Sequence, residues 1–178
     1  DPASTSYIRA KSKAAERVGI DLTHHHLPES TTKSELSSLV KKLNESEDGI
    51  IIQLPLPDGL DSVLNEIDPE KDVDGFHPQN VGRMALGLPA FLPATPNGVI
   101  ELLKRYAIET EGKKCVVVGR SNIVGSPMSI LMSRKGSPGN ATVTLVHSRT
   151  KNIAEITKEA DILIVALGVP EYITADMV

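Results

Sequence analysis

Helical and extended patterns alternate in the first third of the chain. Apolar spacing predicts a helix over residues 5–18, capped by Ser4 and ended by Gly19. A short strand is expected to follow, through the consecutive histidines His24–His26. The order of helix and strand favours an α/β fold.

The same order then repeats. Thr32-x-x-Glu35 is a capping box, which predicts the start of an amphipathic helix. The continuous apolar run 50–54 predicts a strand buried on both faces, as in a parallel sheet covered by helices. Turn-forming residues dominate 55–96, where one short helix is expected over 62–67.

The segment 93–98 has the composition of a domain joint. Thr95 can cap the helix that follows, and Pro96 can occupy its first turn. We therefore predict two domains, one over 1–95 and one over 96–178.

The second domain has the cleaner pattern. Short apolar runs alternate with helical spacing, which predicts half of a Rossmann-like doubly wound parallel sheet. The predicted elements are strands 114–118, 141–147 and 161–167 and helices 127–134 and 153–160. The fold class is α/β, with two α/β domains. We expect both to be incomplete, because the chain opens with Asp1-Pro2 and stops where a helical pattern starts.

Composition narrows the classes of function. The net charge of −4 argues against a general nucleic-acid binder. Residues 1–95 hold 9 basic and 15 acidic side chains, and residues 96–178 hold 10 and 8, so an anionic ligand is expected in the second domain. A single cysteine excludes an internal disulfide. No apolar run approaches the roughly 20 residues of a membrane span.

A glycine turn follows the predicted strand 114–118. It contains Gly119, Arg120, Ser121 and Gly125 and leads into a helix, where backbone N–H groups can bind phosphate. Because the spacing departs from G-x-G-x-x-G, a purely structural turn is an alternative.

The end of the next strand bears on the choice of cofactor. It reads His147-Ser148-Arg149-Thr150, without the acidic residue that favours NAD. Arg149, together with Arg120 and a hydroxyl, favours NADP through charge-assisted bonds to a 2′-phosphate. A solvated charge is the alternative for Arg149.

Three polar residues suggest chemistry in the first domain. Lys11 lies on the predicted first helix, one turn after Tyr7, beside apolar residues. Such a lysine commonly extends its ammonium to water, but one partly removed from water can act as a general acid or base. Tyr7 could stack on an aromatic substrate. Gln53 ends the apolar run 50–54, at the edge where α/β sheets bind ligands, and needs a polar partner.

Two segments of the sequence contain several residues of the types that bind metals. The acidic segment 68–77 has the spacing of neither an EF-hand nor a zinc helix motif. An Asp before Gly is typical of turns, and the functional alternative is a carboxylate that pairs with the N–H edge of a heterocycle. In the run His24–His26, neighbouring side chains of an extended chain point to opposite faces. We predict no metal.

A series of ordered motifs carries a family resemblance over essentially all 178 residues. The motifs are Tyr7-x-x-x-Lys11, Gln53-Leu54-Pro55-Leu56-Pro57, Lys71-Asp72-Val73-Asp74-Gly75, Asn80-Val81-Gly82, Thr95-Pro96-x-Gly98, Val118-Gly119-Arg120-Ser121-x-Ile123-Val124-Gly125 and His147-Ser148. Together they closely resemble the bifunctional methylenetetrahydrofolate dehydrogenase/methenyltetrahydrofolate cyclohydrolase family of one-carbon metabolism. Members of that family extend beyond both ends of this chain, so we expect a fragment.

The resemblance implies two α/β domains with a cleft between them, folate against the first and NADP on the second. It implies an oxidoreductase and hydrolase that oxidises 5,10-methylenetetrahydrofolate with NADP+ and hydrolyses the methenyl product to 10-formyltetrahydrofolate. It also implies a cytoplasmic homodimer that supports purine biosynthesis. Two alternatives stay open: a monofunctional NAD-linked dehydrogenase, and a non-catalytic nucleotide-binding module.

The resemblance also implies roles for individual residues. Lys11 would be the catalytic lysine of the cyclohydrolase step, Tyr7 would stack on the folate, and Gln53 would hydrogen-bond the lysine. Asp74 would anchor the pterin. Leu54 and Pro55 would complete the folate site, and the cofactor residues would be Thr95, Gly119, Arg120, Ser121, Ser148 and Arg149.

Overall fold

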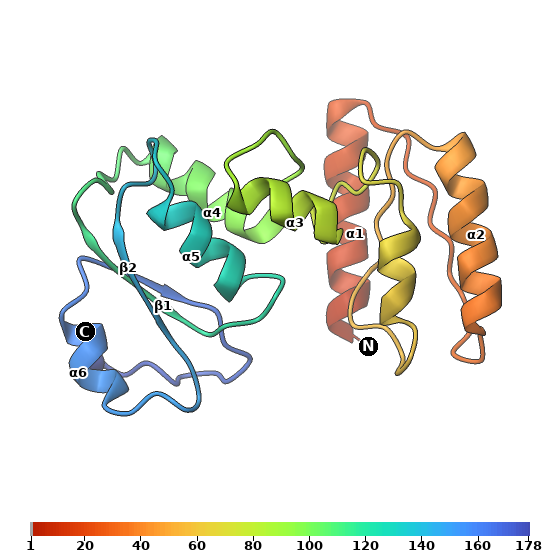
Figure 1. Ribbon diagram of the computed structural model, residues 1–178. Coiled ribbons are helices and arrows are strands. Elements are labelled where there is room, and N and C mark those ends of the chain that lie inside the picture. Colours follow the sequence, from red (N-terminus) through yellow and green to blue (C-terminus); the bar gives the residue numbers. More distant parts are fainter. Residues whose placement is uncertain (1) are drawn as a thin grey trace. The chain divides into compact units, whose positions relative to one another are not determined.

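The chain divides after Asp68 into two compact units (Figure 1). The structure is a computed structural model that describes residues 2–178, with side chains from residue 6 onward. The first unit contains α1 (Pro2–Val18), α2 (Lys33–Ser46) and the 3-10 helix η1 (Asp61–Glu66). The second contains α3 (Pro78–Ala85), α4 (Ala94–Arg105), β1 (Lys114–Val118), α5 (Gly125–Ser133), β2 (Thr142–Val146), α6 (Ile153–Lys158), β3 (Ile162–Val165) and the 3-10 helix η2 (Ala175–Met177).

Helix α2 begins as the sequence predicts. The hydroxyl of Thr32 accepts a hydrogen bond from the backbone N–H of Glu35 at 3.3 Å, and the Glu35 carboxylate accepts from the backbone N–H of Thr32 at 2.7 Å. The capping box is therefore complete. The helix buries Leu36 and Val40 in the core of the first unit, with Val63 beside them from η1.

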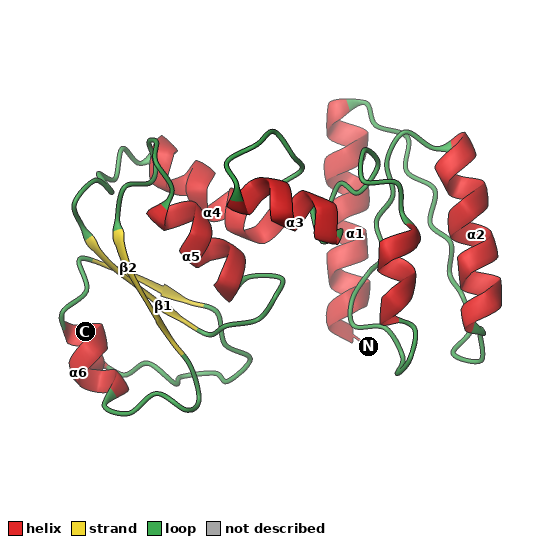
Figure 2. Ribbon diagram, viewed as in Figure 1, coloured by secondary structure: helices red, strands yellow, loops and turns green. Residues whose placement is uncertain are grey.

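Several sequence predictions for the first unit are wrong. Helix α1 begins at Pro2, so Ser4 lies inside the helix and does not precede it. Neither His24–His26 nor 50–54 forms a strand among the described residues (Figure 2). Ile50 is 5% exposed and Ile51 is 41% exposed, so the run faces the core on one side. Periodicity identified an extended apolar segment, but a strand also needs a ladder of backbone hydrogen bonds.

The second unit is built on a three-stranded parallel sheet with the order β2-β1-β3. Alternate side chains of β1 enter two cores, as expected for a strand covered on both faces. Cys115 and Val117 belong to the core that includes α5, and Val116 and Val118 belong to the one that α6 joins. The predicted strands and crossover helices all form, with bounds that match within three residues, which confirms the α/β class.

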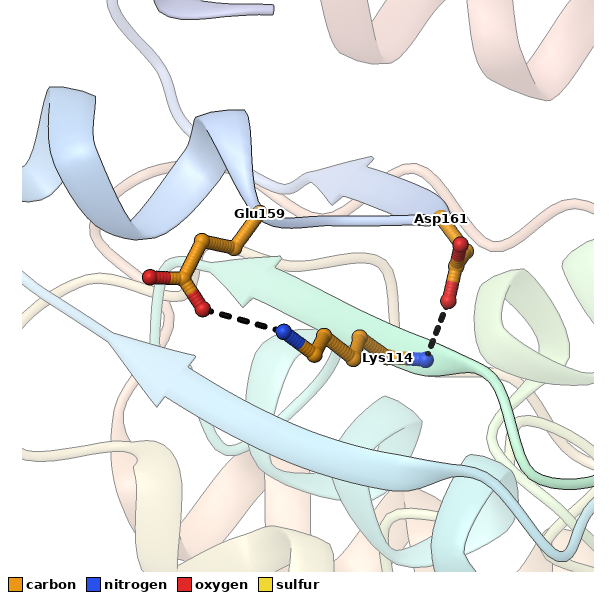
Figure 3. A network of polar contacts seen from close by, with 3 residues as sticks. All are labelled: Lys114, Glu159 and Asp161. Carbon is orange, nitrogen blue, oxygen red and sulfur yellow. Dashed lines mark hydrogen bonds and ion pairs between the residues drawn. The ribbon is translucent and has the colours of Figure 1, made fainter.

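Polar contacts hold the start of β1 to the turn before β3 (Figure 3). The backbone N–H of Lys114 donates to the Asp161 carboxylate at 2.8 Å, and the N–H of Asp161 donates to the Lys114 carbonyl at 2.9 Å. The Lys114 ammonium also pairs with Glu159 at 3.1 Å. These contacts continue the β1–β3 register one residue beyond the ladder.

Helix α3 was not predicted from the sequence and lies in the second compact unit. Pro78 occupies its first turn, and the Nδ1 of His77 accepts from the N–H of Gln79 at 3.1 Å. Met84 of α3 is buried with Met128 of α5. The segment before residue 95 therefore packs within the second compact unit, and the predicted boundary at 95 lies inside that unit.

Candidate functional site

Lys11 and Gln53 meet within the first unit although 42 residues separate them. The Nζ of Lys11 donates to the Oε1 of Gln53 at 3.2 Å, and the side-chain N–H of Gln53 donates to the carbonyl of Leu54 at 3.1 Å. Both residues are half-buried. The amide of Gln53 is oriented at both ends, so it holds the lysine with a neutral acceptor.

Tyr7 lies one helical turn before Lys11, on the same side of α1. Its side chain is 64% exposed, so the ring is available to a flat ligand. Leu54 is half-buried and Pro55 is exposed, directly after Gln53. The structure thus gathers the lysine, its amide partner and two flanking residues in one unit, and leaves the aromatic ring accessible.

Asp74 belongs to the second unit and lies in a tight turn between Asp72 and α3. Its carbonyl accepts from the N–H of Ala94 at 3.3 Å, so the turn is attached to the start of α4. Thr95 is exposed in the first turn of that helix, and Pro93 precedes it without a side-chain cap. The predicted capping role of Thr95 is therefore wrong, because the helix begins one residue before it.

The glycine loop lies at the carboxyl end of β1, the central strand. The N–H of Gly119 donates to the carbonyl of Val146 at 2.8 Å, which attaches the loop to the end of β2. Gly119 has a φ of 111°, and a Cβ built on Gly125 would overlap the backbone of Gly119. Glycine is therefore required at both positions by close backbone approach.

The start of α5 differs from the sequence expectation. The N–H groups of Val124 and Gly125 donate to the hydroxyl of Ser121 at 3.2 and 3.3 Å, and the N–H of Ser126 donates to its carbonyl at 3.1 Å. These donors are paired within the loop and are not free for a phosphate. The Ser121 hydroxyl, which accepts twice, keeps its own hydrogen for a ligand oxygen.

A second turn stands beside this loop. After β2, the N–H of Arg149 donates to Nδ1 of His147 at 3.2 Å. Two bonds with Thr150 close the turn: the N–H of His147 donates to the Thr150 hydroxyl, and the N–H of Thr150 donates to the His147 carbonyl. Ser148 and Arg149 are exposed at its tip, as is Arg120 in the first loop. Because β1 and β2 are parallel and in register, both arginines leave the same edge of the sheet.

This edge has the properties of an anion site. Arginine offers charge and a fork of donors that match a phosphate group. In a doubly wound sheet, ligands bind at the carboxyl ends where the chain crosses from one side of a central strand to the other. Here β1 lies between β2 and β3, so Arg120 and Arg149 stand at that position. The two arginines are suited to a dinucleotide that carries a 2′-phosphate on its ribose.

Two buried polar residues were not identified from the sequence. Asp72 and Asn80 are each 3% exposed and are bonded to one another, whereas the sequence motifs drew attention to Asp74. The only sequence signal for them was that both lie in motifs that carry the family resemblance. In the described part of the chain, no group of three or more metal-ligating side chains is arranged around one point, and no helix is long and apolar enough to span a membrane.

Two models of one family match most of the chain. The model described as "Tetrahydrofolate dehydrogenase/cyclohydrolase, catalytic domain" matches residues 1–74, and the one described as "Tetrahydrofolate dehydrogenase/cyclohydrolase, NAD(P)-binding domain" matches residues 93–178. The order of the two matches agrees with the order of the two groups of candidate residues.

Individual relatives agree with this assignment. The "Bifunctional protein FolD" of Flavobacterium johnsoniae is 59% identical over 180 residues, which include 99% of this chain. The chain spans 61% of that relative's length.

Solved structures share the fold. The bifunctional FolD enzyme of Campylobacter jejuni superposes with a TM-score of 0.93 at 46% identity, over 100% of this chain and 64% of that one. The Trypanosoma brucei dehydrogenase-cyclohydrolase, solved with NADP cofactor and an inhibitor, gives a TM-score of 0.88 at 38% identity. That match covers 96% of this chain and 59% of that one.

Proposed function

The chain belongs to the tetrahydrofolate dehydrogenase/cyclohydrolase family, and from this we propose that the full-length protein catalyses two successive reactions. The first is the oxidation of 5,10-methylenetetrahydrofolate to the 5,10-methenyl form with NADP+. The second is the hydrolysis of the methenyl form to 10-formyltetrahydrofolate. The protein is therefore both an oxidoreductase and a hydrolase of one-carbon metabolism.

The contact between Lys11 and Gln53 is the observation that carries this proposal. Hydrolysis of the methenyl bridge requires a proton to be taken from the attacking water and one to be given to a ring nitrogen. The ammonium of Lys11 is half-buried and held at 3.2 Å by a neutral amide oxygen. This contact supports Lys11 as the group that moves the proton, with Gln53 as its positioning partner.

The remaining residues of the proposed folate site provide binding. The exposed ring of Tyr7 offers a flat surface for stacking on the reduced pterin. Leu54 and Pro55 supply apolar contact beside Gln53, and the carboxylate of Asp74 accepts hydrogen bonds from the N–H edge of the pterin. Orientation of this kind contributes to hydride transfer mainly by reducing the entropy that the reacting groups must lose.

The proposed cofactor site is the carboxyl edge of the sheet. NADP+ bound there would accept the hydride. Arg120 and Arg149 would hold its 2′-phosphate, and the hydroxyls of Ser121 and Ser148 would donate to phosphate oxygens. Gly119 allows the backbone to approach the ligand, and Thr95 would contact the cofactor from the start of α4.

The proposal extends to assembly and location. Following the family resemblance, we assign the protein as a homodimer in the cytoplasm whose formyl product supports purine biosynthesis. A reducing compartment suits the one cysteine, Cys115, which is buried and free. Light scattering of the full-length protein at working concentration measures the assembly directly, and a monomer would contradict it.

The test is an assay of the full-length protein with 5,10-methylenetetrahydrofolate and either NADP+ or NAD+. Reduced cofactor, methenyl intermediate and formyl product are followed separately. The expected result is turnover with NADP+ and methenyl consumption faster than in buffer. Reduced cofactor with a persistent methenyl signal would indicate a dehydrogenase alone. A folded protein that binds nucleotide without turnover would indicate a non-catalytic module.

A further inference from the structure

The buried carboxylate of Asp72 organises the turn that carries Asp74. Its side chain accepts three hydrogen bonds: from the N–H of Phe76 at 3.3 Å, from the N–H of His77 at 2.8 Å and from the side-chain amide of Asn80 at 2.9 Å. Asp72 is 3% exposed. A carboxylate that has lost its water requires donors of this kind, so the conformation of the turn and the charge are mutually dependent.

Asn80 extends this arrangement to the flanking segments. It is 3% exposed, and its side-chain amide also donates to the carbonyl of Pro69 at 2.8 Å. Asn80 lies in α3, so one pair of side chains joins the segment before the turn, the turn itself and the helix after it. Removing the Asp72 carboxylate would leave the half-buried N–H groups of Phe76 and His77 without this acceptor, and the buried amide of Asn80 with the Pro69 carbonyl.

The turn is also fitted closely to the start of α4. Gly75 has a φ of 71°, and a Cβ there would lie 2.5 Å from the carbonyl carbon of Leu92. The carbonyl of Asp74 accepts from the N–H of Ala94. Asp74 therefore projects from a turn whose backbone is fixed on one side by Asp72 and on the other by the segment 92–94. This position allows little adjustment.

We propose that Asp72 is a positioning residue for the folate substrate, acting through Asp74. Its carboxylate sets the backbone from which Asp74 reaches the pterin, without touching substrate itself. This inference rests on the proposed function, because it takes Asp74 as the pterin anchor. A residue that only stabilises the fold would lower stability and affect every ligand alike, whereas Asp72 should affect the folate selectively.

The experiment is a double-mutant cycle in the full-length protein. Asp72→Asn, Asp74→Asn and the double variant are assayed for both reactions, with Glu109→Gln, an exposed carboxylate of the same unit, as the control. Asp72→Asn is expected to lower kcat/KM for the folate in both steps by about 10- to 100-fold, as for the loss of charged hydrogen bonds. The KM for NADP+ should change little. The double variant should be no worse than Asp74→Asn alone.

Each outcome decides between the inference and the proposed function. Losses that multiply in the double variant, or an equal increase in the KM for NADP+, would overturn the inference and leave the function standing. A folded wild-type protein without turnover would overturn the function and, with it, the inference. If Asp72→Asn does not fold, Asn80→Ser removes one of the three bonds and should reduce folate kcat/KM selectively. A variant that retains wild-type folate kinetics would contradict the inference.

Discussion

The two compact units hold their candidate residues in different ways. In the first, Lys11 and Gln53 are far apart in sequence and meet through a hydrogen bond between side chains. In the second, Arg120 and Arg149 are brought to one edge by the backbone ladder between β1 and β2. Substitution in the first unit therefore removes a chemical group from a fixed pair. Substitution in the second removes a proposed contact with the cofactor and leaves the backbone that forms the edge unchanged.

Replacing Lys11 should have the largest effect. Lys11→Met keeps an unbranched side chain and removes the amine that is proposed to move the proton. The cyclohydrolase rate should fall by about 100- to 10,000-fold, the range for loss of a general acid or base. Dehydrogenase turnover should fall far less, because hydride transfer depends on positioning. Single-turnover measurements on methenyltetrahydrofolate separate the two steps.

Lys13→Met is the matched control for this substitution. Lys13 lies on the same helix, is exposed and has no role in the proposed site. It should leave both rates near the wild-type values. Equal losses of the two activities in Lys11→Met would mean that the lysine supports binding or folding, and the contrast between the units would then disappear.

An intermediate effect is expected at the sheet edge. Arg120→Ala and Arg149→Ala should each weaken the binding of NADP+ by about 10-fold or more, because each removes a proposed charge-assisted bond to the 2′-phosphate. NAD+ lacks that phosphate and should bind nearly as before. Fluorescence titration with both nucleotides gives the ratio, and Lys135→Ala, an exposed cation elsewhere in the unit, is the control. Parallel losses for both nucleotides would remove the phosphate assignment.

Sequence reasoning succeeded where backbone geometry determines position. The strands of the second unit were predicted because continuous apolar runs separated by helical spacing have few other folds available. Once they are parallel neighbours, the loops after β1 and β2 must lie together. The position of Arg120 and Arg149 at one edge of the sheet therefore follows from the pattern of elements, without any knowledge of side-chain contacts.

The same reasoning was weaker in the first unit. The run 50–54 has the composition of a buried strand, yet Ile50 and Ile52 pack with α2 and η1 through side chains and no ladder forms. Whether an extended segment becomes a strand depends on neighbours that local sequence does not specify. The contact of Gln53 with Lys11 was suggested by resemblance to a family and by the need of a polar residue for a partner.

Asp72 could not be identified from the sequence for a related reason. Three aspartates lie within Asp68–Asp74, and local sequence treats each as a turn former. Only tertiary structure shows that one of them, Asp72, is buried and accepts hydrogen bonds from two backbone N–H groups and from the side-chain amide of Asn80. Burial of a charge depends on elements distant in space, so motif spacing drew attention to Asp74 instead.

The smallest effect is expected in the first unit, away from its candidate site. Thr32→Ala removes the cap of α2 and should lower the free energy of unfolding by about 1 kcal/mol, with both activities unchanged.

Hydrogen bonds from the Thr32 backbone and hydroxyl lower the pKa of Glu35 below its ordinary 4.5. A group with a lowered pKa stabilises the fold above its unfolded value, and this stabilisation is lost as the pH falls through the folded value. The difference between wild type and Glu35→Gln in urea titrations should therefore shrink below about pH 4.5. A difference that stays constant with pH would mean that the capping box contributes through its helical geometry and not through the carboxylate.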